Sequence, residues 1–140
     1  MENTFSPTNN SSNAKWYCID AKDKSLGRLS SQISQVLTNK YKPDYSFNFN
    51  NGDYLIIINS KTVKLNKPEQ KFIVRYSGNI GGITKKSFLN VINENPNAVI
   101  KKAVKGMLPK GSLGRDYARK LKIYPAEEHP HAAQKPILLN

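Results

Sequence analysis

The chain has 140 residues, of which 22 are lysine or arginine and 10 are acidic, so its formal net charge at pH 7 is +12. This length predicts one domain with a single modest core. A small domain with so large a positive charge repels itself unless an anionic partner neutralises it, and nucleic acid is the leading candidate. An anionic membrane surface is the second candidate, and it is disfavoured because no apolar run approaches the roughly 20 residues that a transmembrane helix requires.

The first half of the chain predicts a strand, a helix and a second strand behind an N-terminal extension. Residues 1–14 are rich in asparagine and serine and contain no lysine or arginine, which is typical of a flexible extension. Residues 16–20 form an apolar run that predicts a short strand. Ser25 is expected to cap an amphipathic helix whose inward side chains recur at helical spacing: Leu26, Leu29, Ile33, Val36 and Leu37. Residues 54–59 are apolar without alternation, which predicts a central strand covered on both faces.

The second half of the chain predicts further strands and helices. Residues 71–76 alternate as a strand does, and residues 87–93 predict a short helix. The pair Asn95-Pro96 predicts the cap and the first residue of a longer helix. A basic helix over residues 113–121 and a short strand over residues 122–124 complete the series. Strands that alternate with helices predict an α/β fold with a mostly parallel sheet of about four strands.

Residues 15–124 are predicted to form the folded domain, and residues 125–140 an extended C-terminal tail that carries His129 and His131. Two histidines separated by a proline do not supply the three or four ligands of a zinc site. Cys18 is the only cysteine, which excludes a disulfide framework and a cysteine cluster. We therefore expect no metal and no cofactor, and we interpret the two histidines as polar contacts between the tail and a partner.

No catalytic site is predicted. The only adjacent acidic residues, Glu127 and Glu128, lie in the tail, and no serine or cysteine stands in the sequence context of a nucleophile. Asp53 follows Gly52 and is interpreted as a turn residue. The sequence therefore predicts a protein that is not an enzyme.

Residues 103–115 join apolar positions at helical spacing to a loop that glycine and proline interrupt. They carry Lys105, Lys110 and Arg115, and the wider range 99–123 holds eight lysines or arginines against one acid. Such a segment cannot bury its charges, and its glycines let the backbone approach another surface closely. We interpret it as a contact surface for a polyphosphate, of which RNA is the commonest large example.

A second glycine-rich segment, residues 75–82, lies between Arg75 and Lys85. Glycines permit backbone N–H groups to converge on a phosphate. The segment lacks the Gly-Lys-Ser/Thr end of a Walker loop and the spacing of a dinucleotide fingerprint. Gly78 and Gly81 fit the GXXG of a KH module, but a plain turn explains the same four residues. Both interpretations remain open.

These segments together resemble the bacterial-type ribosomal protein L-thirteen family of the large ribosomal subunit. The motifs that carry the resemblance occur in the order of that family and cover residues 16 to about 136: Trp16-Tyr17-Cys18-Ile19-Asp20-Ala21, Leu26-Gly27-Arg28-Leu29, Gly52-Asp53-Tyr54-Leu55-Ile56-Ile57-Ile58-Asn59, Ser77-Gly78, Gly81-Gly82, the run 103–110, Leu113-Gly114-Arg115 and Glu128-His129-Pro130-His131-Ala132-Ala133-Gln134. Each motif alone is weak, and their combination is specific.

The resemblance implies a structural protein that binds rRNA, joins the large ribosomal subunit early in assembly and supports translation without catalysis. It implies an open α/β sheet flanked by helices. The implied partners are large-subunit rRNA and neighbouring large-subunit ribosomal proteins, with no membrane and no small-molecule substrate. The N-terminal extension and the run 110–115 are similar to the cyanobacterial and plastid branch. They therefore predict a ribosome in the plastid (chloroplast stroma), with the bacterial cytoplasm as the alternative.

Charge clustering and the matched motifs together predict the residues that contact rRNA. Ten cationic side chains are expected to contact phosphates: Arg28, Lys40, Lys42, Arg75, Lys85, Lys105, Lys110, Arg115, Arg119 and Lys120. Backbone contacts are expected at Ser77, Gly78, Gly81, Gly82, Gly106 and Gly114, and polar contacts at His129 and His131.

Two other functions are compatible with the charge. A free regulatory RNA-binding protein would need the same cations. A small nucleotide-binding α/β enzyme could share the order of strands and helices, but it would need a phosphate fingerprint and an acid–base pair that the sequence lacks.

Overall fold

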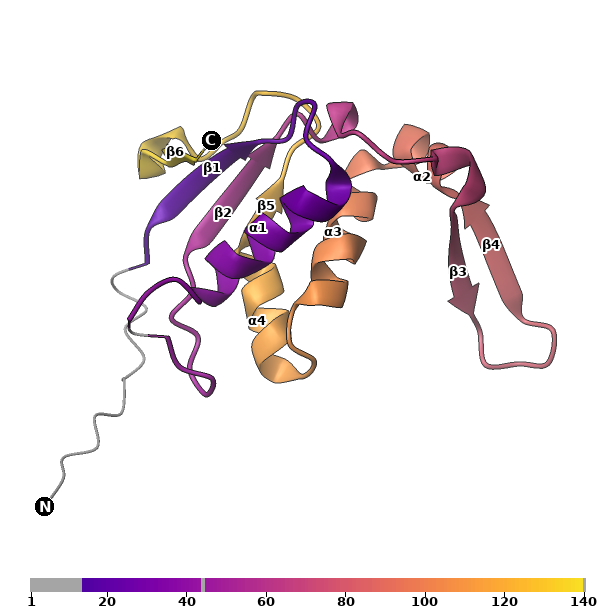
Figure 1. Ribbon diagram of the computed structural model, residues 1–140, viewed down its shortest axis with the longest axis horizontal. Helices are drawn as coiled ribbons and strands as arrows, with labels where there is room; N and C mark the ends of the chain where they lie inside the picture. The colour runs from indigo at the N-terminus through magenta and orange to yellow at the C-terminus, as the bar shows by residue number, and fades with distance from the viewer. Residues whose placement is uncertain (1–13, 44, 140) are drawn as a thin grey trace, which may run out of the picture.

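The computed structural model describes residues 14–43 and 45–139. The extension predicted at residues 1–14 therefore lies, apart from Ala14, outside the described residues. Within the described part, one α/β domain contains a four-stranded sheet with helices packed against it (Figure 1). The predicted fold class is confirmed.

The four-stranded sheet has the order β5–β2–β1–β6. Its strands are β1 (Trp16–Asp20), β2 (Tyr54–Ile58), β5 (Leu121–Ile123) and β6 (Ile137–Leu139), and all three pairings between them are parallel. The strand β2 lies between two neighbours and is covered on both faces, so Leu55, Ile56 and Ile57 are fully buried. This explains why its sequence is apolar throughout instead of alternating.

Three helices cover one face of this sheet: α1 (Leu26–Thr38), α3 (Pro96–Met107) and α4 (Ser112–Lys120). Each helix packs its apolar side chains inward, and the buried ring of Tyr117 is part of the resulting core. The core residues are Ile19, Ala21, Leu29, Ile33, Val36, Leu37, Leu55, Ile57, Ile100, Val104, Leu108 and Tyr117. The inward positions predicted for the first helix are thus confirmed, with Leu26 only partly buried.

The predicted helix boundaries at Ser25 and Asn95 are both found. The Asn95 side chain accepts a hydrogen bond of 3.3 Å from the backbone N–H of Ala98, and Pro96 is the first residue of α3. Ser25 is the cap residue of α1, but its side chain makes no capping hydrogen bond. The start of α1 is held instead by the backbone, because the Leu26 N–H donates to the Lys64 carbonyl at 3.1 Å.

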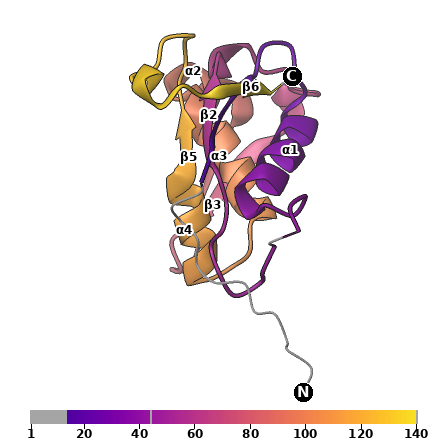
Figure 2. The ribbon, with the colours of Figure 1, turned by 90° about the vertical axis from the view of Figure 1, so that its left-hand side faces the viewer.

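The opposite face of the sheet is covered by aromatic side chains and by the C-terminal tail. Trp16 stacks on Tyr54 with 4.4 Å between ring centroids, and the His131 ring lies 5.3 Å from Trp16. The Tyr124 hydroxyl and the His131 Nε2 atom are hydrogen-bonded at 2.8 Å. The tail then returns to the sheet as β6, at the edge that faces the viewer in Figure 2. The sequence analysis missed this strand.

Cys18 is 4% exposed beneath this second apolar layer, beside Ile56 and Ile58. Burial raises the pKa of its thiol, and the nearby Asp20 carboxylate adds to the effect. Since only the thiolate reacts, we expect Cys18 in the folded protein to resist alkylation by a thiol reagent at pH 7 and to react at once in denaturant. Labelling followed by mass spectrometry measures this, and rapid labelling of the folded protein would contradict the burial of Cys18.

The strand predicted at residues 71–76 is present as β3 (Phe72–Tyr76), but it does not join the main sheet. It pairs antiparallel with β4 (Ile83–Ser87), a strand that the sequence analysis missed because its residues are mostly polar. Figure 1 shows this hairpin extending away from the body of the domain. Its base is attached through α2 (Phe88–Glu94), which packs on α3, and through the short 3₁₀ turn η3 (Pro68–Gln70).

Candidate nucleic-acid interface

Three segments that the sequence analysis singled out lie toward the same side of the molecule, the lower side in Figure 1. They are the chain after α1, the α3–α4 connection with α4, and the tip of the hairpin. The first two carry five exposed cations, here termed the cationic side: Lys40, Lys105, Lys110, Arg115 and Arg119. Four of them fall within residues 105–119, and the fold adds the segment after α1 that carries Lys40 to the same side (Figure 1).

The α3–α4 connection presents its cations outward because its apolar residue is anchored inward. Leu108 is 5% exposed, and its N–H donates to the Val104 carbonyl at 3.0 Å, which closes the last turn of α3. Lys110 is exposed on the connection that follows, and Gly111 takes a φ of 112°, a backbone conformation that side chains disfavour. On α4, the exposed Arg119 pairs with Asp116 at 3.1 Å. A pair so exposed is weak, so the excess positive charge remains available to a partner.

Gly106 and Gly114, which are predicted to contact rRNA through their backbone, have different surroundings. A methyl group on Gly114 would lie 1.8 Å from the Pro109 carbonyl oxygen, so this glycine is required by close packing inside the α3–α4 connection. Gly106 lies in the last turn of α3, where a methyl group would meet no atom within 4 Å. The fold of the chain therefore explains Gly114 and leaves Gly106 open toward solvent.

We expect these two glycines to respond oppositely to alanine. Gly114→Ala should lower the free energy of unfolding by about 1–3 kcal/mol, because the new methyl group collides with backbone. Gly106→Ala should raise it by about 0.5–1 kcal/mol, since alanine favours the helix. Urea unfolding of both variants measures the difference. Equal effects would show that the packing around Gly114 is not what the structure describes.

Asp53 is not a turn residue, as the sequence analysis expected, but the centre of a buried polar cluster. It is fully buried and accepts hydrogen bonds from the Lys15 N–H at 3.0 Å and the Tyr41 hydroxyl at 2.8 Å. The Lys42 ammonium lies 2.7 Å from Oδ2, the oxygen that also accepts from Tyr41, and donates to Oδ1 at 2.9 Å. The sequence analysis assigned Asp53 to a turn because an aspartate that follows a glycine has the same local sequence whether its carboxylate is buried or lies in a turn.

The cluster around Asp53 also occupies two of the cations predicted to contact phosphate. Lys42 is paired with Asp53, and the Lys120 ammonium donates to the Gly52 carbonyl at 2.5 Å. Burial lowers the pKa of Lys120. Desolvation of the hydroxyl end of Tyr41, together with its hydrogen bond to Asp53, raises the pKa of that phenol. Both lysines thus already have partners inside the protein, unlike the exposed lysines of the cationic side.

The hairpin tip holds the predicted contacts Ser77, Gly78, Gly81 and Gly82, with Arg75 and Lys85 on the strands below. Gly78 has a φ of 88° and Gly81 a φ of 74°, and the Ser77 N–H donates to the Gly82 carbonyl at 2.9 Å. The turn itself therefore requires these glycines. The exposed tip can still approach a partner, so a structural role of these glycines in the turn does not conflict with the predicted contact to RNA.

The remaining predicted residues lie elsewhere. His129 and His131 belong to the aromatic layer on the far face of the sheet. Arg28 lies on the first turns of α1, in a cleft whose lining also includes Lys64 and Lys71. The sequence analysis missed these two lysines, because only the fold brings them beside Arg28.

Neither a metal centre nor a membrane span is found among the described residues. Among residues 14–43 and 45–139, no three histidine, cysteine or acidic side chains converge as a metal site would require. None of the helices in that part of the chain has the length and apolarity of a membrane crossing. What the described residues offer is fixed positive charge on a folded scaffold.

Comparison with known proteins agrees with this arrangement. The family "Ribosomal protein L13" matches residues 14–130. The chain is 47% identical to the large ribosomal subunit protein uL13 of Acaryochloris marina over all of this chain and 94% of that protein. It is 46% identical to uL13 of Chromohalobacter salexigens, with 98% of each chain covered. It is 50% identical to uL13c of Porphyra purpurea over 86% of this chain and 87% of that protein.

Proposed function

The chain belongs to the ribosomal protein L13 family, and from that premise we propose that it is a structural constituent of the large ribosomal subunit that binds rRNA. Its role is architectural and non-catalytic, and it supports early assembly of the subunit and thereby translation. The observation that carries the proposal is the cationic side, where five cations from α3, α4, their connection and the chain after α1 are exposed.

The physics of the contact follows from this surface. Each lysine or arginine that neutralises a phosphate releases condensed counterions, so binding weakens as salt rises. The proposed phosphate contacts are Lys40, Lys105, Lys110, Arg115 and Arg119 on the cationic side, Arg75 and Lys85 on the hairpin, and Arg28 in the cleft. The glycine tip of the hairpin brings backbone N–H groups to the sugar-phosphate chain, which favours recognition of folded RNA by shape and 2′-hydroxyl groups.

Fractionation of ribosomes tests the proposal. We expect the protein to migrate with the large subunit in a sucrose gradient and to remain there after a high-salt wash. A free regulatory RNA-binding protein would wash off, and a nucleotide-binding enzyme would remain among the soluble proteins. Depletion of the protein should also lead to incomplete large-subunit particles. Normal particles without it would contradict the role in assembly.

We further propose that the ribosome concerned is that of a plastid. The support is the similarity to uL13c of the red algae Porphyra purpurea and Pyropia yezoensis, at 50% and 49% identity. The bacterial cytoplasm is the alternative, because bacterial relatives are nearly as similar. Immunolabelling of cells distinguishes the two compartments: signal in the chloroplast stroma supports the plastid, and its absence there favours the alternative.

A further inference from the structure

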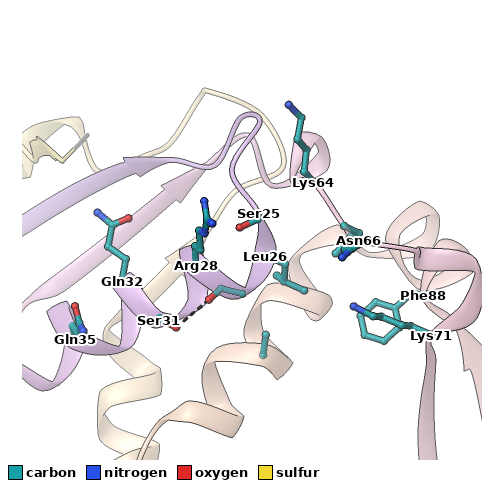
Figure 3. A pocket seen from close by; sticks show the side chains of 13 residues that line it. Ser25, Leu26, Arg28, Ser31, Gln32, Gln35, Lys64, Asn66, Lys71 and Phe88 are labelled. Atoms are coloured by element: carbon teal, nitrogen blue, oxygen red, sulfur yellow. Dashed lines mark hydrogen bonds between the residues drawn. The ribbon is translucent and has the colours of Figure 1, made fainter.

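A cleft of about 820 Å³ lies between α1 and the base of the hairpin (Figure 3). One wall is the first part of α1, the other is formed by residues 64–66 with Lys71 and Phe88, and Ala103 of α3 also lines it. This volume is within the range of about 300–1,000 Å³ that is usual for small-ligand sites. The cleft is therefore large enough for a defined chemical group and not only for water.

Backbone hydrogen bonds hold the two sides of the cleft in place. The Lys64 N–H donates to the Lys24 carbonyl at 3.0 Å, and the Leu26 N–H donates to the Lys64 carbonyl at 3.1 Å. These bonds fix the 64–66 segment along the start of α1. On the other side, the Phe88 N–H donates to the Lys71 carbonyl at 3.1 Å, which sets the aromatic ring next to the lysine. The lining is thus a consequence of the fold and does not depend on a free loop.

The lining combines three kinds of group. Its cations are Arg28, Lys64 and Lys71, and none of the described residues that line it is acidic. Uncharged amides are provided by Gln32, Gln35 and Asn66, and an apolar surface by Leu26, Ala103 and the ring of Phe88. Lys64 also pairs with Asp23 at 3.1 Å, but both side chains are about two-thirds exposed, so the pair is easily exchanged for a stronger anion.

We propose that this cleft binds an unpaired nucleotide of the rRNA that the protein contacts. The inference rests on the proposed function. The cations serve the phosphate, the amides serve the base edge, and the apolar wall with Phe88 serves the flat face of the base. A base inside a duplex cannot enter, because its faces and its pairing edge are already covered. An acidic peptide would use the cations but would leave the aromatic ring and the amides without a partner.

Gly27 provides the sharpest test of this assignment. It lies on the α1 wall, its carbonyl accepts a hydrogen bond from the Ser31 hydroxyl at 3.1 Å, and a methyl group there would meet no atom within 4 Å. Gly27→Leu therefore adds a bulky side chain to a lining position of the cleft where a Cβ has room, without a change of charge. Because leucine favours the helix, we expect the midpoint of thermal unfolding to stay the same or rise. Binding to large-subunit rRNA should nevertheless fall on the order of 10- to 100-fold.

A matched control and a structural readout complete the experiment. Ala133→Leu adds a leucine at an exposed position in η4 (Ala132–Gln134), on the tail, and should bind rRNA as the unaltered protein does. Chemical probing of the rRNA should show one or two unpaired bases that the unaltered protein protects and Gly27→Leu does not. Equal protection and equal affinity for the two would overturn the cleft assignment and leave the proposed function standing. Failure of the unaltered protein to bind rRNA would instead overturn the proposed function.

Two further variants separate the contributions within the cleft. Phe88→Leu keeps an apolar side chain but removes the aromatic face, and we expect it to weaken rRNA binding about tenfold with the salt dependence unchanged. Lys71→Gln should reduce the salt slope by about 0.7, the value for one phosphate contact on a single strand. If Gly27→Leu instead abolishes binding of a polyglutamate peptide and leaves rRNA binding intact, the cleft belongs to a protein partner and the proposal is wrong.

Discussion

Replacing Lys105, Lys110 and Arg115 together by alanine is expected to weaken rRNA binding by roughly 10²–10³-fold at about 0.1 M salt. All three side chains are exposed on the cationic side, around the α3–α4 connection. Each phosphate contact contributes about 0.7–0.9 to the slope of log K against log salt, so loss of three contacts should reduce the slope by about 2–3. Filter binding at several salt concentrations measures both quantities, and undiminished affinity and slope would refute the assignment of this segment.

The matched control removes the same charge from other places. Lys22, Lys61 and Lys135 are exposed, and they lie after β1, in η2 (Ser60–Thr62) and in the tail. Changing these three to alanine gives the same net charge as the first variant. If charge acts only as a general attraction, both triple variants should lose the same affinity. If the cationic side is the docking surface, the control variant should keep most of the slope of log K against log salt that the unaltered protein shows.

Asp53→Asn should lower the free energy of unfolding by about 3 kcal/mol, which is about 10 °C in thermal midpoint for a domain of this size. The amide keeps the shape of the carboxylate and can still accept from the Lys15 N–H, but it loses the charge that pairs with Lys42. The expected cost is at the lower end for a buried ion pair, because the Lys42 side chain is 24% exposed and can regain some water.

Asp23→Asn is the control for this prediction. Asp23 also pairs with a lysine, Lys64, at 3.1 Å, but both side chains are about two-thirds exposed. Such pairs contribute little, so a loss below about 0.5 kcal/mol is expected. Calorimetry of both variants makes the comparison. Similar losses of unfolding free energy at the two positions would mean that Asp53 is not the buried centre of its polar cluster.

Local patterns identified most of the elements in advance, because their signals are local. The unbroken apolar run of β2, the spacing of Leu29 and Ile33, and the Asn95-Pro96 start of α3 all depend on near neighbours in the chain. The strand β6 and the separation of the hairpin were missed. The strand β6 depends on its distant pairing with β1, and a three-residue strand such as Ile137–Leu139 has no periodicity of its own. The hairpin was not recognised because β4 is mostly polar, so no partner was predicted for β3.

The same distinction applies to the proposed interface. Composition and glycine placement pointed to the α3–α4 connection, since its cations are close in sequence. They could not reveal that Lys42 is bound to a buried carboxylate while Lys40, two residues earlier, is exposed. Nor could they place Lys64 and Lys71 beside Arg28. The fold decides whether a cation is exposed and which residues lie beside it, and a count of charges in the sequence gives neither.

The pairing of β1 with β6 also governs how the protein reaches its folded state. Tyr17 lies opposite Ile137, so most of the described residues lie between two neighbouring strands, which are synthesised far apart in time. Closing so long a loop is entropically costly, and contacts of this separation are associated with slow folding. Until β6 arrives, one side of β1 presents unsatisfied backbone groups that a second nascent copy could capture. Prompt delivery to a binding partner would shorten the interval during which that hazard exists.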